Sequence, residues 1–528
     1  MEFPVIDLFA GPGGLGEGFS SLNNGQLKFK IIASAEKDQY AHETLKLRAY
    51  FRRLKSDFPQ YLSDYYDFVN GNSDLPWTER TRDIWQDAVS EALLVELGTE
   101  EGNARLNAVI EDRLKDFPKD MPAVLIGGPP CQAYSLAGRA KNMNDARYDP
   151  LKDTRNFLYR EYLKVLQSHS PAVFVMENVK GILSSKINNQ FIFHQILQDL
   201  SEPTKALFNK KDGHRYVICS LVTDVHFKAG DDPSSIDSRS FIIKSEDYGI
   251  PQCRHRVILL GIREDYYRDD IPLLEKTEIR TVGSVINELP RLRSKFSKID
   301  DSAEVWSRLI SESIRAIAER LRSKKRKADS ELIKNLTKVS KSLPKEVLKT
   351  GGLRVPEVEH NFAVSKIELL EGWYKDNNLK VVLNHESRGH ILKDIVRYTY
   401  AACFAMTNER SPRGHGDYDH VGLAPSHKNW QSGKFVDRFK VQEREKPAST
   451  ITSHISKDGH YFIHYDPTQA RSLTVREAAR IQTFPDNYFF QGPRTQQYHQ
   501  VGNAVPPMLA KQIAAVVLKV LADKAVEK

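Results

Sequence analysis

Short apolar runs, separated by glycine turns and helical patterns, dominate the first part of the chain. Helical patterns at residues 17–22 and 41–54 lie between or after the earliest of these runs. Alternating strands and helices are typical of a doubly wound sheet, where ligands bind at the carboxyl ends of the strands. We therefore predict an α/β fold on such a sheet. Five runs have the length and composition of its buried strands: residues 4–9, 30–35, 123–126, 171–176 and 256–261.

The pattern becomes less regular further along the chain. Residues 56–120 are polar and patchily helical, and we interpret them as a motif-poor insertion. A charged helical zone at 301–349 is followed by loops rich in His, Gly, Asn and Ser, and the chain ends in an amphipathic helix at 506–525. The predicted domains are a catalytic domain at 1–271, an inserted irregular domain at 272–466, and a last segment, 467–528, that returns to the first domain.

Composition narrows the class of protein. The chain has 77 Lys and Arg against 69 Asp and Glu, a net charge of +8, which suits a polyanionic partner without proving one. Because no apolar run approaches the roughly 18–20 residues that span a bilayer, we expect no membrane segment. A strand-like run already begins at Phe3, so no signal peptide is expected.

The cysteines point to a reducing compartment. There are four of them, and no two are spaced as CxxC: Cys131, Cys219, Cys253 and Cys403. This pattern argues against a disulfide framework and against a zinc site. We therefore expect a cytoplasmic protein that holds no metal.

The glycine turn after the first predicted strand is a candidate ligand site. The turn Gly11-Pro12-Gly13-Gly14 allows backbone amides to approach a ligand at a helix N-terminus. Glu36 ends the second strand, 20 residues after Gly16, where an acid can accept hydrogen bonds from ribose hydroxyls. Taken alone, this pattern fits NAD, FAD, S-adenosylmethionine or a plain structural turn.

Three further motifs place reactive groups at strand ends. Cys131 follows a strand and two prolines, so its thiol is held at a polar rim where a thiolate can be stabilised. Glu177 ends the strand 171–176, and Arg254 and Arg256 stand two apart at the entry to the last strand. Each has a structural alternative: an inert loop cysteine, a turn-capping acid and a solvated charge pair.

Taken in order, these motifs resemble those of one family. The segments FAGPGG, PPCQ, ENV and QCRHR resemble the DNA cytosine-5 methyltransferases of bacterial restriction–modification systems. The resemblance covers about residues 3–46, 122–262 and 445–525. One family element has no match: the acid beside the cofactor adenine, after a third strand, cannot be placed between Leu54 and Asp120. Further agreement comes from DTRNFL (153–158), YGIP (248–251), residues 471–485 and GNAVPP (502–507).

The resemblance implies a role for each matching residue. It implies that the Cys131 thiolate adds to carbon-6 of cytosine, that Glu177 contacts ring nitrogen-3, and that Arg256, helped by Arg254, binds the base carbonyl. Further contacts to the base are implied for Gln132, Ser135, Asn178 and Gln252. The implied cofactor is S-adenosylmethionine, bordered by Phe9, Ala10, Gly11, Gly13, Gly14, Glu36, Lys37, Pro130, Leu158, Asn503 and Ala504.

The resemblance also implies a partner. Double-stranded DNA is the expected substrate, with the target cytosine flipped out of the helix. Residues 272–466 would read the sequence in the major groove, where the four base pairs are distinguishable. The basic run 322–327 binds phosphate or is a solvated helix face. A cognate restriction endonuclease is a second expected partner, and a monomer is expected.

Other functions fit the sequence less well. A tRNA cytosine-5 methyltransferase has the same motifs, but the large region 272–466 favours DNA. A catalytically silent DNA-binding relative would not need Cys131, Glu177 and Arg256 together. A nicotinamide dehydrogenase explains the glycine turn but not PPCQ or ENV. An amino-group methyltransferase would carry Tyr or Trp after the two prolines, where this chain has Cys131.

Overall fold

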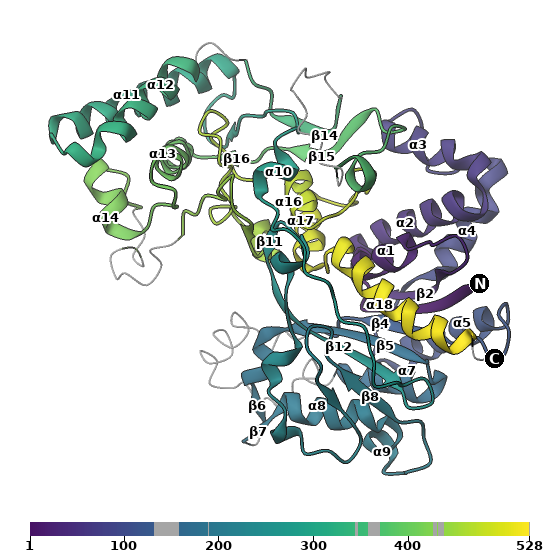
Figure 1. The fold of residues 1–528 in the computed structure, drawn as a ribbon. Coiled ribbons are helices and arrows are strands. Elements are labelled where there is room, and N and C mark those ends of the chain that lie inside the picture. Colours follow the sequence, from purple (N-terminus) through teal and green to yellow (C-terminus); the bar gives the residue numbers. More distant parts are fainter. Residues whose placement is uncertain are drawn as a thin grey trace. The chain divides into compact units, whose positions relative to one another are not determined.

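The chain forms two units in the computed structural model. The structure describes residues 1–130, 158–187, 189–343, 347–356, 370–425, 430 and 438–526. Unit 1 comprises Met1–Tyr65, Leu75–Glu278 and Ala504–Lys528, and unit 2 comprises Tyr66–Asp74 and Ile279–Asn503. Figure 1 labels helices and strands of both units where there is room.

Unit 1 is built on one large mixed sheet. Its strands lie in the order β3-β2-β1-β4-β5-β12-β8-β9, with β10 pairing with β12. The strands β3, β2, β1, β4 and β5 are parallel, and β12 is antiparallel to β5 and β8. The predicted α/β sheet is therefore confirmed. Its strands are β1 (Glu2–Leu8), β2 (Lys28–Glu36), β3 (Ala92–Leu94), β4 (Val124–Gly127), β5 (Val173–Val179), β8 (Tyr216–Cys219), β9 (His226–Phe227), β10 (Ile242–Lys244) and β12 (His255–Arg263).

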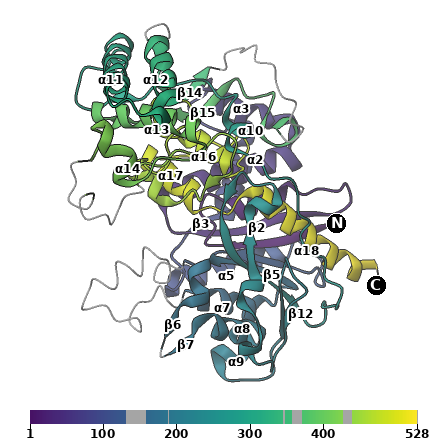
Figure 2. The ribbon, with the colours of Figure 1, turned by 60° about the vertical axis from the view of Figure 1, so that its left-hand side comes forward.

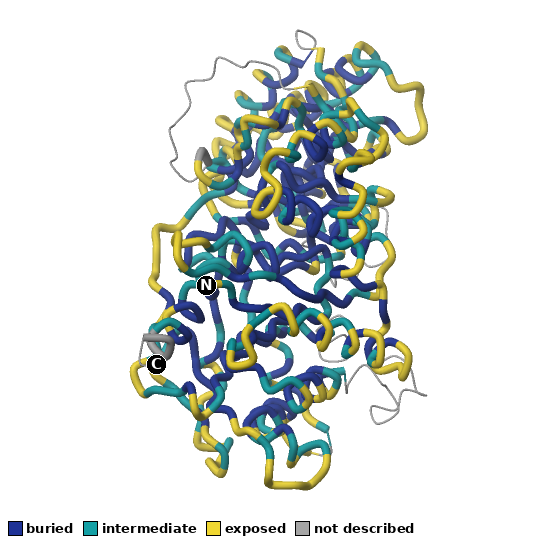
Figure 3. Tube along the Cα trace, turned by 90° about the vertical axis from the view of Figure 1, so that its right-hand side faces the viewer, coloured by how far each residue is buried: buried dark blue, intermediate teal, exposed yellow. Residues whose placement is uncertain are grey.

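Helices cover both faces of this sheet. Successive residues of a strand point to opposite faces, so Val5 packs with the layer of α1 (Gly14–Ser21) and α18 (Pro507–Val526), whereas Ile6 packs with the other layer. That second layer contains α5 (Glu100–Leu114), α7 (Tyr159–His169) and α8 (Ile192–Ser201). Buried residues run through the sheet and the inner sides of the helices (Figure 3).

Glycines let α1 pack closely against its neighbours. A Cβ on Gly18 would overlap the Ala510 side chain of α18, and one on Gly14 would overlap the Val505 carbonyl. The helix α2 (Gln39–Asp57) is joined to α1 by a buried ion pair, in which Arg48 Nε donates to Glu17 Oε2 over 2.7 Å. These contacts fix the helix that follows the glycine turn.

Unit 2 combines a helical layer with a two-stranded sheet. The helices α11 (Ala303–Ser323), α12 (Ser330–Ser342) and α13 (Leu392–Asn408) share a core around Trp306 and Tyr398. The strands β14 (Gly351–Pro356) and β15 (Val381–Glu386) pair antiparallel. Turning the view by 60° separates α11 from α12 (Figure 2).

The remaining elements are short. The helices are α3 (Leu62–Asn70), α4 (Arg82–Glu91), α9 (Pro203–Phe208), α10 (Val282–Ile286), α14 (Gly414–Tyr418), α16 (Val475–Ile481) and α17 (Arg494–Asn503). The strands are β6 (Lys186–Ile187), β7 (Gln190–Phe191), β11 (Gln252–Cys253), β13 (Lys295–Phe296), β16 (Gly389–His390) and β17 (Ala448–Ser449).

The structure divides the chain differently from the expected domains in two places. Residues 56–120 are not simply an insertion, because they contain β3, the edge strand of the main sheet, and α5, which covers it. The segment 467–503 lies in unit 2, and only Ala504 onward returns to unit 1. The reason is burial: the fully buried Arg476 donates hydrogen bonds to the carbonyls of Leu383, Pro485 and Tyr488, which ties this segment to β15.

One stretch of the described residues is long and apolar enough to cross a membrane by length and composition, Arg494–Ala522. In the structure 72% of its most apolar window is buried inside the protein. Because α18 packs on the sheet through Leu509, Ile513 and Val517, this apolar character is explained by the core of unit 1.

Asp7 predicts a pH dependence of stability. Its carboxyl is buried on β1, and burial raises its pKa to about 8. The folded chain therefore keeps a proton that the unfolded chain loses above about pH 4, so stability falls as the pH rises towards 8, by at most about 1.4 kcal/mol per pH unit. In Asp7→Asn, which mimics the neutral acid, urea unfolding at pH 5, 6, 7 and 8 should show a flatter dependence. The exposed Asp83→Asn should match wild type; equal slopes in all three proteins would contradict this assignment.

Candidate active site

The carboxyl ends of the parallel strands bring the first group of predicted residues together. Phe9, Ala10 and Gly11 follow β1, and Glu36 and Lys37 stand at the end of β2. The Ala10 amide donates to the Ala35 carbonyl over 3.0 Å, and the Gly11 amide donates to Glu36 Oε2 over 2.8 Å. The turn after β1 is thus tied directly to the end of β2.

The Glu36 carboxylate also accepts backbone hydrogen bonds, which the sequence did not predict. Its Oε1 accepts the amides of Lys37 and Asp38, at 2.9 and 2.7 Å, in addition to the Gly11 amide on Oε2. A carboxylate has about four acceptor positions, so capacity for a ligand hydroxyl remains. Burial raises the pKa of Glu36, and these three amides oppose that shift.

The glycine turn leaves room for a ligand. Gly11 has φ +57°, and a Cβ built on it would meet nothing within 4 Å. Gly13, at φ 94°, precedes α1 without a side-chain cap, so the first amides of that helix form an anion- or dipole-binding end. Phe9 also has a positive φ, of 55°, a strained conformation for an aromatic residue. An open cradle of this kind fits the adenosyl group that the resemblance implies.

The structure adds a residue that the sequence analysis missed. Glu96 lies two residues after the last residue of β3, at the same end of the parallel strands as Glu36, and its carboxylate lies 3.3 Å from Lys37 Nζ. Leu158, which precedes α7, lies next to Gly98 of the same turn: a Cβ on Gly98 would be 3.8 Å from its side chain. Because β3 has only three residues, no period-2 pattern could identify it.

The turn after β4 lies against Glu177 of β5. A Cβ on Gly128 would lie 3.2 Å from Glu177 Oε2, so the glycine lets the turn approach the carboxylate. Asn178 Nδ2 donates to the Pro129 carbonyl over 3.5 Å, and its Oδ1 accepts the Val179 amide. Glu177 therefore stands beside the residues Gly128–Pro130 that lead into Cys131.

Two arginines complete this arrangement. Arg256 Nε lies 2.9 Å from Glu177 Oε1, and both side chains are only about one-seventh exposed, at 15% and 13%. Arg254 is buried, and burial together with the nearby charge of Arg256 lowers its pKa well below the usual range. Gln252 is also buried, two residues before Arg254. The arginine motif is thus brought to Glu177.

Some predicted residues are not placed by this geometry. Cys131, Gln132, Ser135 and the segment 153–157 lie outside the described residues. Ala504 is described and lies beside Gly14 in unit 1. Asn503 is exposed and ends α17, which belongs to unit 2.

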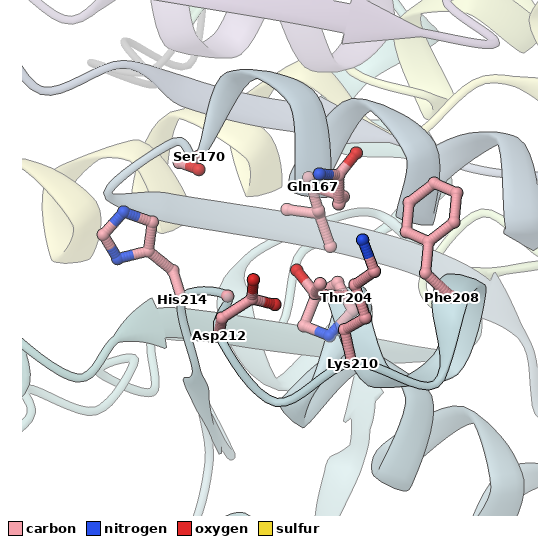
Figure 4. Close-up of a pocket in the computed structure, with 10 residues that line it drawn as sticks. Gln167, Ser170, Thr204, Phe208, Lys210, Asp212 and His214 are labelled. Carbon is pink, nitrogen blue, oxygen red and sulfur yellow. The ribbon is translucent and has the colours of Figure 1, made fainter.

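A separate pocket of about 420 Å³ lies at the other end of the strands, away from Glu177 and Arg256 (Figure 4). Its lining includes Ser170, which precedes β5, and His214, which precedes β8. Glu177 and Arg256 stand at the other ends of β5 and β12, since Arg256 is paired with Val179 and Ile262 with Val173. This pocket is therefore not part of the candidate active site.

Comparison with known proteins identifies the family. A family model described as C-5 cytosine-specific DNA methylase matches residues 101–203 and 238–519, more than half of the chain. The chain belongs to the C-5 cytosine-specific DNA methylase family. It is therefore a DNA (cytosine-5-)-methyltransferase, as the order of the sequence motifs predicted.

Similar methyltransferases cover almost the whole chain. The type II methyltransferase M.Bpa9945I of Bacillus paralicheniformis is 31% identical over 98% of this chain and 99% of its own length. M.DdeI of Desulfomicrobium norvegicum is 26% identical over 97% of this chain and 87% of its own. M.AgeI of Thalassovita gelatinovora is 25% identical over 97% and 98%. The methylase similarity thus includes unit 2 as well as the sheet.

Because Glu36 holds the turn, its loss should affect folding and ligand binding together. Glu36→Ala removes the acceptor of three amides and should lower the free energy of unfolding by about 1–3 kcal/mol. We expect S-adenosylmethionine affinity to fall by a similar free energy, measured by isothermal titration calorimetry. Glu43→Ala, at a partly exposed acid of α2 that pairs with Lys46 one turn further on, is the control and should change each by no more than about 0.5 kcal/mol. Normal stability and affinity in Glu36→Ala would show that the turn does not depend on this carboxylate.

Proposed function

We propose that this methyltransferase methylates carbon-5 of a cytosine flipped from a specific duplex sequence, using Cys131, Glu177, Arg254 and Arg256. The observation that carries the proposal is the Glu177–Arg256 ion pair, held against the Gly128–Pro130 turn that leads into Cys131. The family match supports the reaction, and the positions of Glu177, Arg254 and Arg256 support their part in the assignment.

Each of these residues has a distinct chemical task. Carbon-5 of cytosine is a weak nucleophile, so the Cys131 thiolate adds to carbon-6 and forms a carbon–sulfur bond. Glu177 contacts ring nitrogen-3 and the amino group, where charge changes as the bond forms. Arg256 binds the base carbonyl and holds the Glu177 carboxylate, while the buried Arg254 adds positive charge beside them. Once carbon-5 carries the methyl group, loss of its proton to a base breaks the carbon–sulfur bond and expels the thiolate.

Further base contacts come from neighbouring positions. We assign Asn178 and Gln252 to the walls of the base pocket, because both are buried beside the catalytic motifs. Gln132 and Ser135 keep the same assignment from the family motif alone.

The cofactor would be held at the carboxyl ends of β1–β4. The cradle at Gly11, the Glu36 carboxylate and the packing of Leu158 against the turn after β3 fit an adenosyl group. When bound, S-adenosylmethionine supplies the electrophilic methyl group that carbon-5 accepts. Its other proposed contacts are Phe9, Ala10, Gly13, Gly14, Lys37, Pro130, Asn503 and Ala504.

We assign Glu96 to the acid that the family places beside the adenine. It lies two residues after the end of β3, it is exposed at the end of the strands where Glu36 stands, and Lys37 Nζ lies 3.3 Å from its carboxylate. An exposed carboxylate there can accept a hydrogen bond from the adenine amino group. Lys37 holds it in place without burying it.

Unit 2 is our candidate for sequence recognition. The motifs with proposed chemical roles lie mostly in unit 1, whereas unit 2 holds the region that the family uses in the major groove. The segment Tyr66–Asp74 belongs to it as well, since Arg354 Nε donates to the Val69 carbonyl over 2.9 Å.

The named relatives support a biological setting. The three relatives above are all called type II methyltransferases, which favours DNA over tRNA as substrate and protection against a cognate restriction endonuclease as the role. We propose that the enzyme acts as a monomer on cytoplasmic DNA.

Bisulfite sequencing of DNA from cells that express the protein tests the function. We expect protected cytosines at one short sequence motif with wild type and none with Cys131→Ala. Methylation scattered without a shared motif would contradict sequence-specific action. Unmethylated DNA with folded wild type would contradict the activity.

A trapping experiment tests the nucleophile. In DNA where 5-fluorocytosine replaces cytosine throughout, the fluorine cannot leave as the proton does, so wild type with S-adenosylmethionine should form a covalent complex on a denaturing gel. Cys131→Ala should form none yet still bind DNA, because groove contacts do not use the thiol. Glu177→Gln should form the complex about 10²–10⁴-fold more slowly. A covalent band with Cys131→Ala would assign the attack to another residue.

Glu96 has a matched control one turn away. Glu96→Gln removes the charged acceptor and should weaken S-adenosylmethionine binding by roughly 1 kcal/mol, about fivefold in Kd. Glu100→Gln, an exposed acid in the first turn of α5, should leave Kd unchanged. Equal Kd values for wild type and Glu96→Gln would remove Glu96 from the site.

A further inference from the structure

The α11–α12 hairpin of unit 2 carries positive charge that the proposed chemistry does not use. Residues 303–343 contain eleven Lys and Arg against five Asp and Glu, a net charge of +6. The whole chain carries +8. The hairpin thus accounts for most of the excess charge of the protein.

Packing holds the hairpin in shape. The two helices lie side by side, and both contact α13. Leu321 of α11 and Leu332 and Leu336 of α12 are buried in their shared core. The charged side chains therefore project from two helices whose positions are fixed by packing.

The outer face of α12 is a row of lysines. Lys334, Lys338 and Lys341 stand four and three residues apart, so they share one face of the helix, and all are exposed. Leu332, Leu336 and Val339 are buried on the opposite face. Lys334 lies 3.4 Å from Glu331, whereas Lys338 and Lys341 form no ion pair with another described residue. We refer to these three residues as the lysine row.

The neighbouring helix shows what an ordinary solvated face looks like. On α11, the exposed Arg308 and Arg315 alternate with the exposed Glu312 and Glu319. Mixed charges of this kind favour solubility without selecting a partner. The lysine row differs because its exposed charges are all positive, apart from Glu331, which pairs with Lys334.

The turn between the helices extends this positive surface. Arg322, Lys325 and Lys327 are exposed there. Lys325 has φ 50°, the left-handed conformation just past a helix end that glycine adopts most easily. The chain thus carries a charged residue where the backbone favours glycine.

We propose that the lysine row and this turn bind the phosphate backbone of duplex DNA without reading its bases. The inference rests on the proposed function, since it needs a DNA substrate. Lysine ammonium groups are compact point charges on flexible stems, which suits contacts to phosphate oxygens, and such contacts carry no sequence information. Each phosphate contact releases counterions, so the contribution of the row must depend on salt.

Salt titration of DNA binding tests the proposal. The probe is a fluorescent duplex of about 40 base pairs and mixed sequence, bound by the full chain between about 50 and 200 mM KCl. Changing the three lysines of the row to Gln keeps helix propensity and length. It should weaken binding at least tenfold at the lowest salt and reduce the slope of log K against log[salt] by about 0.9 per lost contact. Lys205, Lys210 and Lys211 of unit 1, changed together to Gln, control for net charge and should have little effect.

A second variant separates binding from stability. Lys325→Gly removes a charge where glycine suits the backbone, so it should leave the melting temperature unchanged or raised while lowering DNA affinity. The row variant should keep wild-type methyl transfer at saturating DNA. Equal salt slopes for row and control variants would overturn the proposal and leave an acidic protein as the partner that the row fits. Absence of methyl transfer by wild type would instead reject the proposed function.

Discussion

The register between β5 and β12 is the constraint on which the candidate site depends. The two strands are antiparallel, with Ile258 opposite Glu177 and Arg256 opposite Val179, so the Arg256 guanidinium reaches back to the Glu177 carboxylate. Both groups are largely buried, and loss of one would leave the other as an uncompensated charge at a cost of about 3–5 kcal/mol. Because β5 is also parallel to β4, the same register brings Glu177 beside the turn that precedes Cys131.

On the proposed cofactor side of the sheet, the Glu36 carboxylate both holds the backbone turn and can bind a ligand. Glu36 accepts three amides and so fixes the turn after β1, yet it keeps acceptor capacity at the edge of an open cradle. The close packing of Gly14 and Gly18 then fixes the direction in which α1 leaves that turn. A ligand at this position meets a preorganised backbone, which reduces the ordering cost of binding.

The main strands could be predicted from the sequence because long apolar runs encode them. A short strand and a set of buried contacts could not. Five strands and the residues at their ends followed from apolar runs of four or more residues. The three-residue β3 shows no period, so Glu96 was not found, although it follows a strand of the main sheet. The segment 467–503 was placed with the catalytic domain, because no pattern reveals that Arg476 is buried against the carbonyls of Leu383 and Tyr488.

The central proposal is that Cys131, the residue after Pro130 in the chain, attacks the target base, while Glu177 and Arg256 at the ends of β5 and β12 contact the same base. Mass-spectrometric mapping of the protein–DNA adduct formed on 5-fluorocytosine tests it most directly. The account predicts that the modified tryptic peptide spans residues 120–139, which contain Cys131 alone of the four cysteines. An adduct on a peptide with Cys219, Cys253 or Cys403, or on no cysteine, would contradict it.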